Sequence, residues 1–175
     1  MTQPPSSRDR LQPALLDRLL APKDGATPAL SKRQLREGVL RDLRWLLNAV
    51  QPHPDWAKER PELAGTVLNF GIPVLTGKQA SSVTLAQLEL DIANAIKRFE
   101  PRILPHSLEV KAFEPEDVLG THNVIEFEIK GLLWALPVPL EVLYRTRLDL
   151  EAGLVNVKDV HLGDAQLAPE TGRVL

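Results

Sequence analysis

The chain has 175 residues, of which 21 are Lys or Arg and 23 are Asp or Glu, so its formal charge at pH 7 is only −2. This length suits one domain with extensions. The balanced charge excludes a protein that gathers nucleic acid or anionic membrane through a global field. The absence of cysteine excludes disulfides, thiol catalysis and the usual structural zinc sites.

The polar residues at the start of the chain, Met1 to Arg10, do not resemble a secretory signal. No apolar run approaches the roughly 20 residues that a membrane-spanning helix needs. We therefore expect a cytoplasmic protein without direct membrane insertion.

Residues 1–31 are expected to hold a polar tail, a short docking helix and a linker. The helix is predicted from leucines at helical spacing, which are Leu11, Leu15, Leu16 and Leu19. Pro22 ends this helix, because proline lacks the N–H group that would continue it. Proline and glycine recur in the linker that follows, so the helix is predicted to be a detachable docking element.

Residues 32–162 are predicted to be the folded domain, which begins with two amphipathic helices. Ser31 offers an N-cap to the first, whose apolar stripe is Leu35, Val39, Leu43, Leu46 and Leu47. An irregular proline-rich loop is expected between residues 51 and 61, and a loop packed on the core between residues 63 and 77. The second helix is expected to begin near Thr84, with the stripe Leu85, Leu88, Ile92, Ile96 and Phe99.

Alternation with a period of two residues predicts half-buried strands in the rest of the domain. They cover residues 108–112, 125–129, 140–150 and 154–160, with a turn at 151–153. Helices followed by antiparallel strands indicate an α+β fold, with two or three helices packed on a small antiparallel β-meander. Such a meander has an edge to which another chain can add a strand. Residues 163–175 are expected to be a loose tail.

The second helix runs directly into Glu100, Pro101 and Arg102. Pro101 disfavours helical geometry at Glu100, so the chain turns there and holds an acid and a base beside a rigid kink. The two charges could be a catalytic acid with its electrostatic partner, or an ion pair that fixes a helix end or serves an interface. The structural or binding interpretation is favoured, because glycoside hydrolysis needs a second facing carboxylate and the sequence singles out none.

Other chemical sites are not indicated by the sequence. The four histidines show no ligand spacing, and no serine has a histidine or aspartate at a recognisable spacing. We therefore predict no catalytic residue, no cofactor and no metal ion.

Several segments together resemble the TssE family of type VI secretion baseplate subunits, which is related to the phage T4 baseplate wedge protein of the "lysozyme-like" family. The segments are Leu15-Leu16-Asp17-Arg18-Leu19, Val67-Leu68-Asn69-Phe70-Gly71-Ile72-Pro73, Phe99-Glu100-Pro101-Arg102, Phe127-Glu128-Ile129-Lys130-Gly131 and Leu148-Asp149-Leu150-Glu151-Ala152-Gly153. The likeness runs from about residue 11 to residue 160. Phe70 stands where many relatives have tyrosine, which removes a hydroxyl group.

The resemblance implies a non-enzymatic, structural subunit of a contractile injection machine, which links the baseplate wedge to the sheath and helps to initiate sheath assembly. It implies baseplate wedge partners of the TssF, TssG and TssK type, together with contractile sheath subunits, in a cytoplasmic baseplate docked at the membrane. Glu100, Pro101 and Arg102 match the family motif, which would order an interface to the wedge or the first sheath ring. Further partner contacts are expected at Asn69, Phe70, Leu15, Leu16 and Leu19.

Two other functions remain open at this point. One is a peptidoglycan hydrolase of the lysozyme-like type that uses Glu100 as general acid, although a wall hydrolase needs export and the sequence shows no signal. The other is an adaptor of an unrelated cytosolic assembly, which would use the same strand edge and leucine helix.

Overall fold

The computed structural model describes residues 14–20, 30–52, 59–75, 84–113, 124–135 and 137–162. Its elements in chain order are α1 (Leu15–Leu20), α2 (Lys32–Asn48), the 3-10 turns η2 (Pro61–Leu63) and η3 (Val67–Asn69), α4 (Leu85–Phe99), the 3-10 turn η5 (Pro105–Ser107), β1 (Glu109–Phe113), β2 (Val124–Leu133), β3 (Leu140–Asp149) and β4 (Leu154–Asp159). The two long helices and the antiparallel sheet make an α+β fold, which confirms the predicted class.

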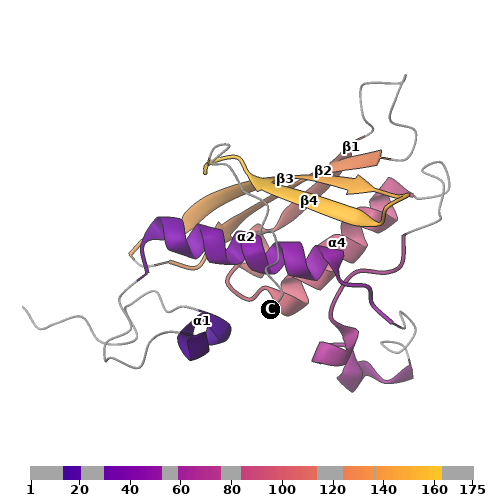
Figure 1. Cartoon of the computed structure of the whole chain (residues 1–175), viewed down its shortest axis with the longest axis horizontal. Helices are drawn as coiled ribbons and strands as arrows, with labels where there is room; N and C mark the ends of the chain where they lie inside the picture. Colours follow the sequence, from indigo (N-terminus) through magenta and orange to yellow (C-terminus); the bar gives the residue numbers. More distant parts are fainter. Residues whose placement is uncertain are drawn as a thin grey trace, which may run out of the picture.

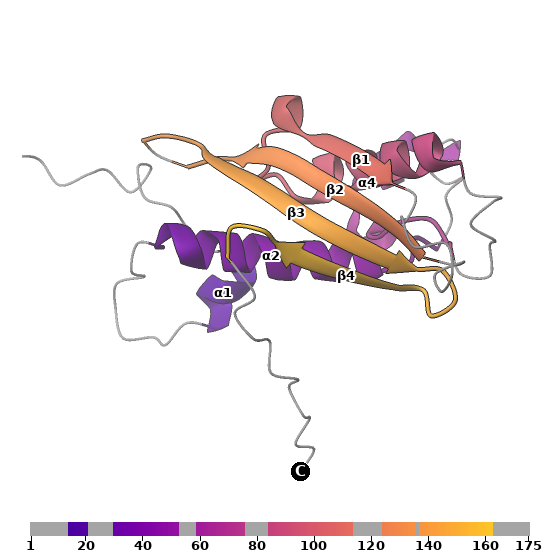
Figure 2. The same ribbon diagram turned by 90° about the horizontal axis from the view of Figure 1, so that it is seen from above.

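The sheet is a meander in which each strand pairs with the next along the chain, in the order β1-β2-β3-β4. Helices α2 and α4 cover one of its faces, α2 beneath β4 and α4 beneath β1 (Figures 1 and 2). All four predicted strands are present, and β2 extends further in both directions than the alternation had indicated. The result is a two-layer domain with its core between the sheet and the two helices.

The core is built from the alternating positions of the strands and from the helical stripes. Phe127 and Tyr144 are the largest fully buried side chains, and both lie on the face of the sheet that the helices cover. All of the predicted stripe on α2 is buried, whereas Leu85 and Phe99 at the two ends of the α4 stripe are only partly buried. Burial of these apolar surfaces is the main favourable contribution to folding.

The first long helix begins as the sequence predicts. The Ser31 side chain accepts a hydrogen bond from the backbone N–H of Gln34, and the Gln34 side chain accepts one from the backbone N–H of Ser31. This reciprocal capping box satisfies N–H groups that the first turn of a helix leaves free. It fixes where α2 starts, and therefore which residues α2 turns toward the core.

The loop between η2 and residue 75 packs on the core, as predicted. Its backbone pairs with the end of α2: the N–H of Gln51 donates to the carbonyl of Ile72 over 2.9 Å, and the N–H of Ile72 donates to the carbonyl of Ala49 over 3.0 Å. Gly71 makes this approach possible with a φ of +127°, because a Cβ atom there would lie 2.4 Å from the Ala49 oxygen. The glycine is required by both backbone conformation and space.

Helix α1 lies on the side of α2 that faces away from the sheet (Figure 1). Its presence confirms the short helix predicted before Pro22. The predicted tails at residues 1–10 and 163–175 lie outside the described residues, as does most of the proline-rich loop.

Replacing Gly71 by alanine should lower the free energy of unfolding by about 2 kcal/mol or more, because it adds both backbone strain and a clash with the Ala49 carbonyl. Gly65→Ala is the matched control, since no atom lies within 4 Å of its Cβ position and its φ is not positive. Urea unfolding of both variants measures the difference. Equal effects at the two positions would contradict the requirement for glycine at 71.

Candidate partner-binding site

The site is built at the end of α4, where the chain turns. Glu100 is the C-cap residue of α4, and its backbone N–H still donates to the carbonyl of Ile96. Pro101 follows and cannot continue the helix, so Arg102 folds back beside the helix end. The turn brings Glu100 and Arg102 together, and the Glu100 side chain is only 3% exposed.

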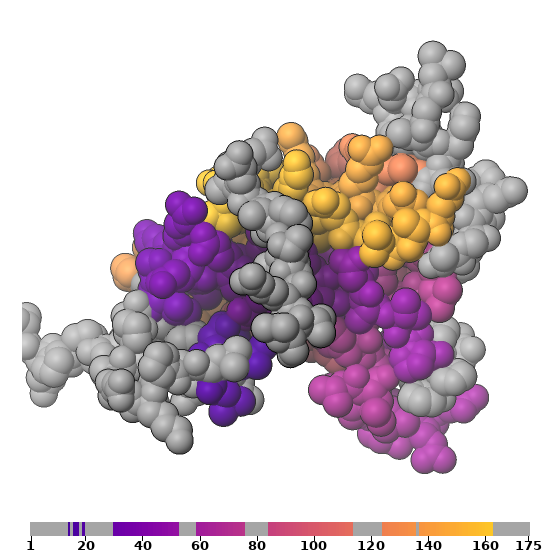
Figure 3. Space-filling model, viewed as in Figure 1, coloured from indigo at the N-terminus to yellow at the C-terminus, as the bar shows by residue number. Residues whose placement is uncertain are grey.

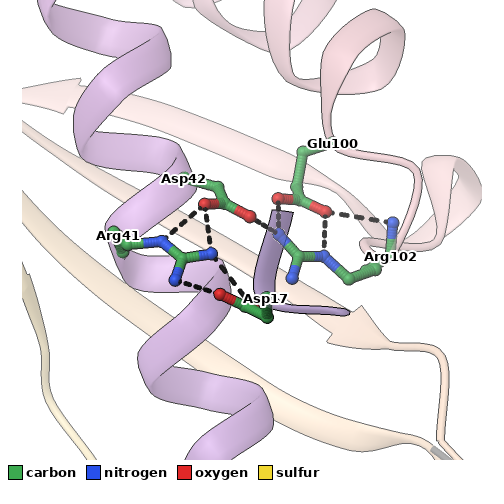
Figure 4. Close-up of polar contacts among 5 residues, drawn as sticks. All are labelled: Asp17, Arg41, Asp42, Glu100 and Arg102. Carbon is green, nitrogen blue, oxygen red and sulfur yellow. Dashed lines mark hydrogen bonds and ion pairs between the residues drawn. The ribbon is translucent and has the colours of Figure 1, made fainter. Parts of the chain in front are cut away.

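The two charged residues form a two-point ion pair. Arg102 Nε lies 2.7 Å from Glu100 Oε1, and Arg102 Nη2 lies 2.6 Å from Glu100 Oε2 (Figure 4). The backbone N–H of Arg102 also donates to Glu100 Oε1 over 3.2 Å. Of the two interpretations left open by the sequence, this geometry supports a fixed pair that holds a helix end, because both carboxylate oxygens are occupied by Arg102.

The pair continues into α2 and then into α1. Arg102 Nη2 also contacts the carboxylate of Asp42, and the Asp42 carboxylate accepts a 2.9 Å bond from Arg41 Nε. Arg41 in turn donates to both oxygens of Asp17 on α1, over 2.6 and 3.2 Å. These five residues form one continuous charge chain, which joins the end of α4, the middle of α2 and the helix α1 (Figure 4).

The electrostatics of the charge chain favour its ionised form. Burial acts to lower the pKa of the Arg102 guanidinium, but hydrogen bonds and charges from Glu100 and Asp42 outweigh it and raise this pKa. The hydrogen bond from Arg41 is the largest influence on Asp17 and lowers the pKa of its carboxyl group. The same bond, with help from Asp42, raises the pKa of Arg41. Opposite charges therefore keep these three groups charged at neutral pH.

Gly38 on α2 provides space for the charge chain. A Cβ atom at this position would lie 3.6 Å from Arg102 Nη1 and 4.0 Å from Asp17 Oδ2. Glycine inside a helix is destabilising by roughly 0.5–1 kcal/mol relative to alanine. Both distances are ordinary van der Waals contacts, so alanine also fits at this position, whereas a larger side chain would meet Arg102 or Asp17.

The other predicted partner-binding residues lie in two places. Asn69 is fully buried and donates from its Nδ2 atom to the carbonyl of Ala64 over 3.0 Å, while Phe70 packs edge-to-face on Phe99 with ring centroids 5.3 Å apart. The loop is thereby attached to the last turn of α4. Leu16 and Leu19 on α1 are 42% and 73% exposed.

The side chain of Leu15 lies outside the described residues. The structure therefore brings Glu100, Pro101 and Arg102 together with the helix α1 and the Asn-Phe-Gly loop, around the end of α4. Contact of any of these residues with a partner stays a prediction.

Sequence reasoning missed Asp17, Gly38, Arg41 and Asp42 as members of the site. Asp42 does interrupt a helix that is rich in Lys and Arg on its polar faces, but so does Glu37, which pairs with the exposed Arg33. The sequence therefore does not distinguish the acid that joins the charge chain from the one on the surface.

One of the two edges of the sheet, the edge of β4, is closed by side chains of α2. Asn48 of α2 donates to the carbonyl of Val155 over 2.8 Å and accepts from the N–H of Val155 over 2.9 Å, as a neighbouring strand would. Arg44 donates to the carbonyl of Val157 from both Nε and Nη2, over 3.1 and 2.8 Å. The edge of β4 is thus already occupied by α2, which prevents strand addition there.

At the opposite edge of the sheet, the carboxylate of Glu89 accepts the N–H of Ala112 over 2.8 Å. Among the described residues, one side chain from α4 therefore bonds to this point of β1, in contrast to the two residues that occupy the edge of β4.

Within the described residues there is no cluster of His, Cys, Asp or Glu that could hold a metal ion. None of the helices that the structure describes is long and apolar enough to cross a membrane.

The family described as baseplate wedge protein gp25 matches residues 33–138 of the chain. This range contains α2, α4, β1 and β2, and with them every member of the charge chain except Asp17. Neither the curated proteins nor the solved structures gave a significant match.

Replacing Glu100 by glutamine should lower the free energy of unfolding by about 2 kcal/mol, because it leaves the guanidinium of Arg102 partly buried with only Asp42 as a charged partner. Glu37→Gln is the control, since its pair with Arg33 is on the exposed surface of α2 and should contribute less than about 0.5 kcal/mol. Chemical denaturation measures both. Similar losses would mean that the pair at Glu100 contributes no more than a surface ion pair.

The contact of α1 with α2 should depend on pH in a defined direction. Because the pKa of Asp17 is lowered from its ordinary value of 3.8, the stabilisation is complete well above that value and is lost as the pH falls through the lower, docked pKa. An NMR titration of the α1 amides should show this step. Asp17→Asn should abolish the step, and its persistence in that variant would assign it to another group.

Proposed function

The chain belongs to the family of the baseplate wedge protein gp25, and from this we propose that it is a structural wedge subunit of a type VI secretion baseplate, of the TssE type. In this role it links the wedge to the contractile sheath and helps to initiate sheath assembly through protein–protein contacts. Its partners are wedge subunits of the TssF, TssG and TssK type and the sheath subunits. The assembly lies in the cytoplasm, docked at the membrane.

The observation that carries the proposal is the charge chain around Arg102. In the motif shared with TssE proteins, Glu100-Pro101-Arg102, the two charged side chains bind each other, and Arg102 also binds Asp42 of α2. The motif thereby sets the position of α2 against the end of α4. It does so next to exposed apolar side chains at Leu16 and Leu19. A fixed polar centre with exposed leucines beside it is suited to protein recognition, because protein interfaces combine an apolar centre with polar groups around it.

We propose that the sheath subunit binds at the edge of β1. The edge of β4 is occupied by Asn48 and Arg44, whereas on β1 the bond from the N–H of Ala112 to Glu89 can be exchanged for one to an incoming strand. Phe113 at the end of β1 is 46% exposed and offers an apolar contact beside that edge. Strand addition relies on main-chain hydrogen bonds, so it tolerates variation in the partner's sequence.

The geometry does not favour the peptidoglycan hydrolase. A general acid must reach the glycosidic oxygen of its substrate, but both oxygens of Glu100 are bound to Arg102 and the side chain is almost completely buried. An adaptor of an unrelated assembly is less well supported than a wedge subunit, because the family match covers nearly all of the two long helices and two of the four strands.

Co-purification with TssF-type and TssG-type wedge subunits tests the proposal. The full chain should bind them, and the double variant Leu16→Ser with Leu19→Ser should lose at least about tenfold in affinity through loss of apolar contact area. Leu154→Ser is the control, since Leu154 is 63% exposed and belongs to β4, which lies on the other side of α2 from α1 (Figure 1). Circular dichroism checks that every variant folds.

Two results would contradict the proposal. Unchanged binding by the double variant would remove α1 from the interface. Failure of the wild-type chain to bind, together with Glu100-dependent cleavage of peptidoglycan, would establish the hydrolase instead.

A further inference from the structure

The contacts of α1 with the rest of the domain that the structure describes are mainly ionic. Among the described residues, α1 makes no extensive contact with another helix or strand, and its leucines at 16 and 19 are exposed. In the space-filling view it stands out from the body of the domain beside α2 (Figure 3). Its six residues are too few for a stable isolated helix, and among the described contacts the pair between Asp17 and Arg41 is the one that fixes its position.

The guanidinium of Arg41 is held in place independently of α1. Its Nε atom is bound to Asp42, and its face lies over the ring of Trp45 at 5.0 Å from the ring centroid. Nη2 also lies 2.9 Å from Asp42 Oδ1, and both carboxylate oxygens of Asp17 occupy the edge that carries Nη1 and Nη2. A guanidinium edge held in this way matches the geometry of any carboxylate.

The surface next to this edge has room for a carboxylate. Gly38 lies one helical turn before Arg41, and the Cβ atom that it lacks would sit 4.0 Å from Asp17 Oδ2. Even with α1 in place, 35% of the Arg41 side chain is exposed. The seat for the carboxylate, by which we mean the Arg41 guanidinium edge over Gly38, therefore belongs to α2. Asp17 of the same chain occupies this seat.

We propose that the edge of the Arg41 guanidinium over Gly38 is a carboxylate-binding site, that Asp17 is its in-chain occupant, and that an acidic side chain of a protein partner takes the place of Asp17 when α1 leaves. Leu16 and Leu19, which are already exposed on the docked helix, then contact the same partner. Only the identity of that partner, a wedge subunit, rests on the proposed function.

The carboxylate site can be tested in the full chain alone, with succinate as the probe at constant ionic strength. The Nε–Hε signal of Arg41 is followed by NMR in the wild type and in Asp17→Asn. In the variant the signal should shift and saturate at roughly tenfold lower succinate than in the wild type, because a tethered carboxylate competes at high effective concentration. The signal of Arg33, an exposed arginine on the same helix, is the internal control.

Two outcomes of this titration would overturn the site. One is equal dependence on succinate in the wild type and in Asp17→Asn. The other is a shift of Arg33 that parallels that of Arg41, which would show only general attraction of anions to arginine.

Displacement is tested by binding to the wedge partner. Asp17→Asn should bind about tenfold more tightly than the wild type, because no in-chain carboxylate has to be displaced. Gly38→Leu should bind more weakly because it fills the seat, while Gly38→Ala, which the space accommodates, should bind like the wild type. Weaker binding by Asp17→Asn would overturn displacement and show that docked α1 is part of the interface.

The succinate titration and the binding assay separate the two proposals. If the wild type and Asp17→Asn both fail to bind wedge subunits while succinate saturates Arg41, the proposed function fails and the assignment of the partner fails with it. If wedge subunits bind but succinate does not discriminate between the two chains, the wedge role stands and the carboxylate site is rejected.

Discussion

The guanidinium of Arg102 is the group on which the arrangement of the helices depends. It binds both oxygens of Glu100 at the end of α4 and the carboxylate of Asp42 in the middle of α2. Breaking a largely buried ion pair is expensive, because it leaves a charge without a partner away from water. The apolar core holds the helices on the sheet, and we infer that Arg102 selects how α2 and the end of α4 meet. Asp42 also binds Arg41, and Arg41 binds Asp17, so the position of α1 is linked to that of Arg102.

The two faces of α2 have different tasks. Its apolar stripe packs under the sheet, and Asn48 and Arg44 reach around to bind the open backbone groups of β4. The side away from the sheet carries Gly38, Arg41 and Asp42, where α1 is held. Helix α2 thus blocks strand addition at the edge of β4, and on its opposite side it presents the Arg41 guanidinium that binds α1. This division is consistent with a subunit that binds partners at some surfaces and prevents binding at others.

Much of the fold could be predicted from the sequence because it rests on local signals. The stripe on α2, the cap at Ser31 and the alternation along β3 each specify an element from neighbouring residues. The kink at Pro101 likewise located the centre of the site. The contacts of Arg102 with Asp42, and of Arg41 with Asp17, could not be predicted, because they join residues far apart in the chain through side chains that also suit a solvated surface. The closure of β4 by Asn48 was missed for the same reason, since no local pattern indicates that a helix side chain will imitate a strand.

A double-mutant cycle between Asp42 and Arg102 is the most direct test of this account. The free energy of unfolding is measured for the wild type, Asp42→Asn, Arg102→Gln and the double variant. We expect a coupling energy of about 1–3 kcal/mol, as for residues that share a buried ionic network. Effects that add within about 0.5 kcal/mol would show that the two residues act independently, and Arg102 would then not be the group that joins α2 to the end of α4.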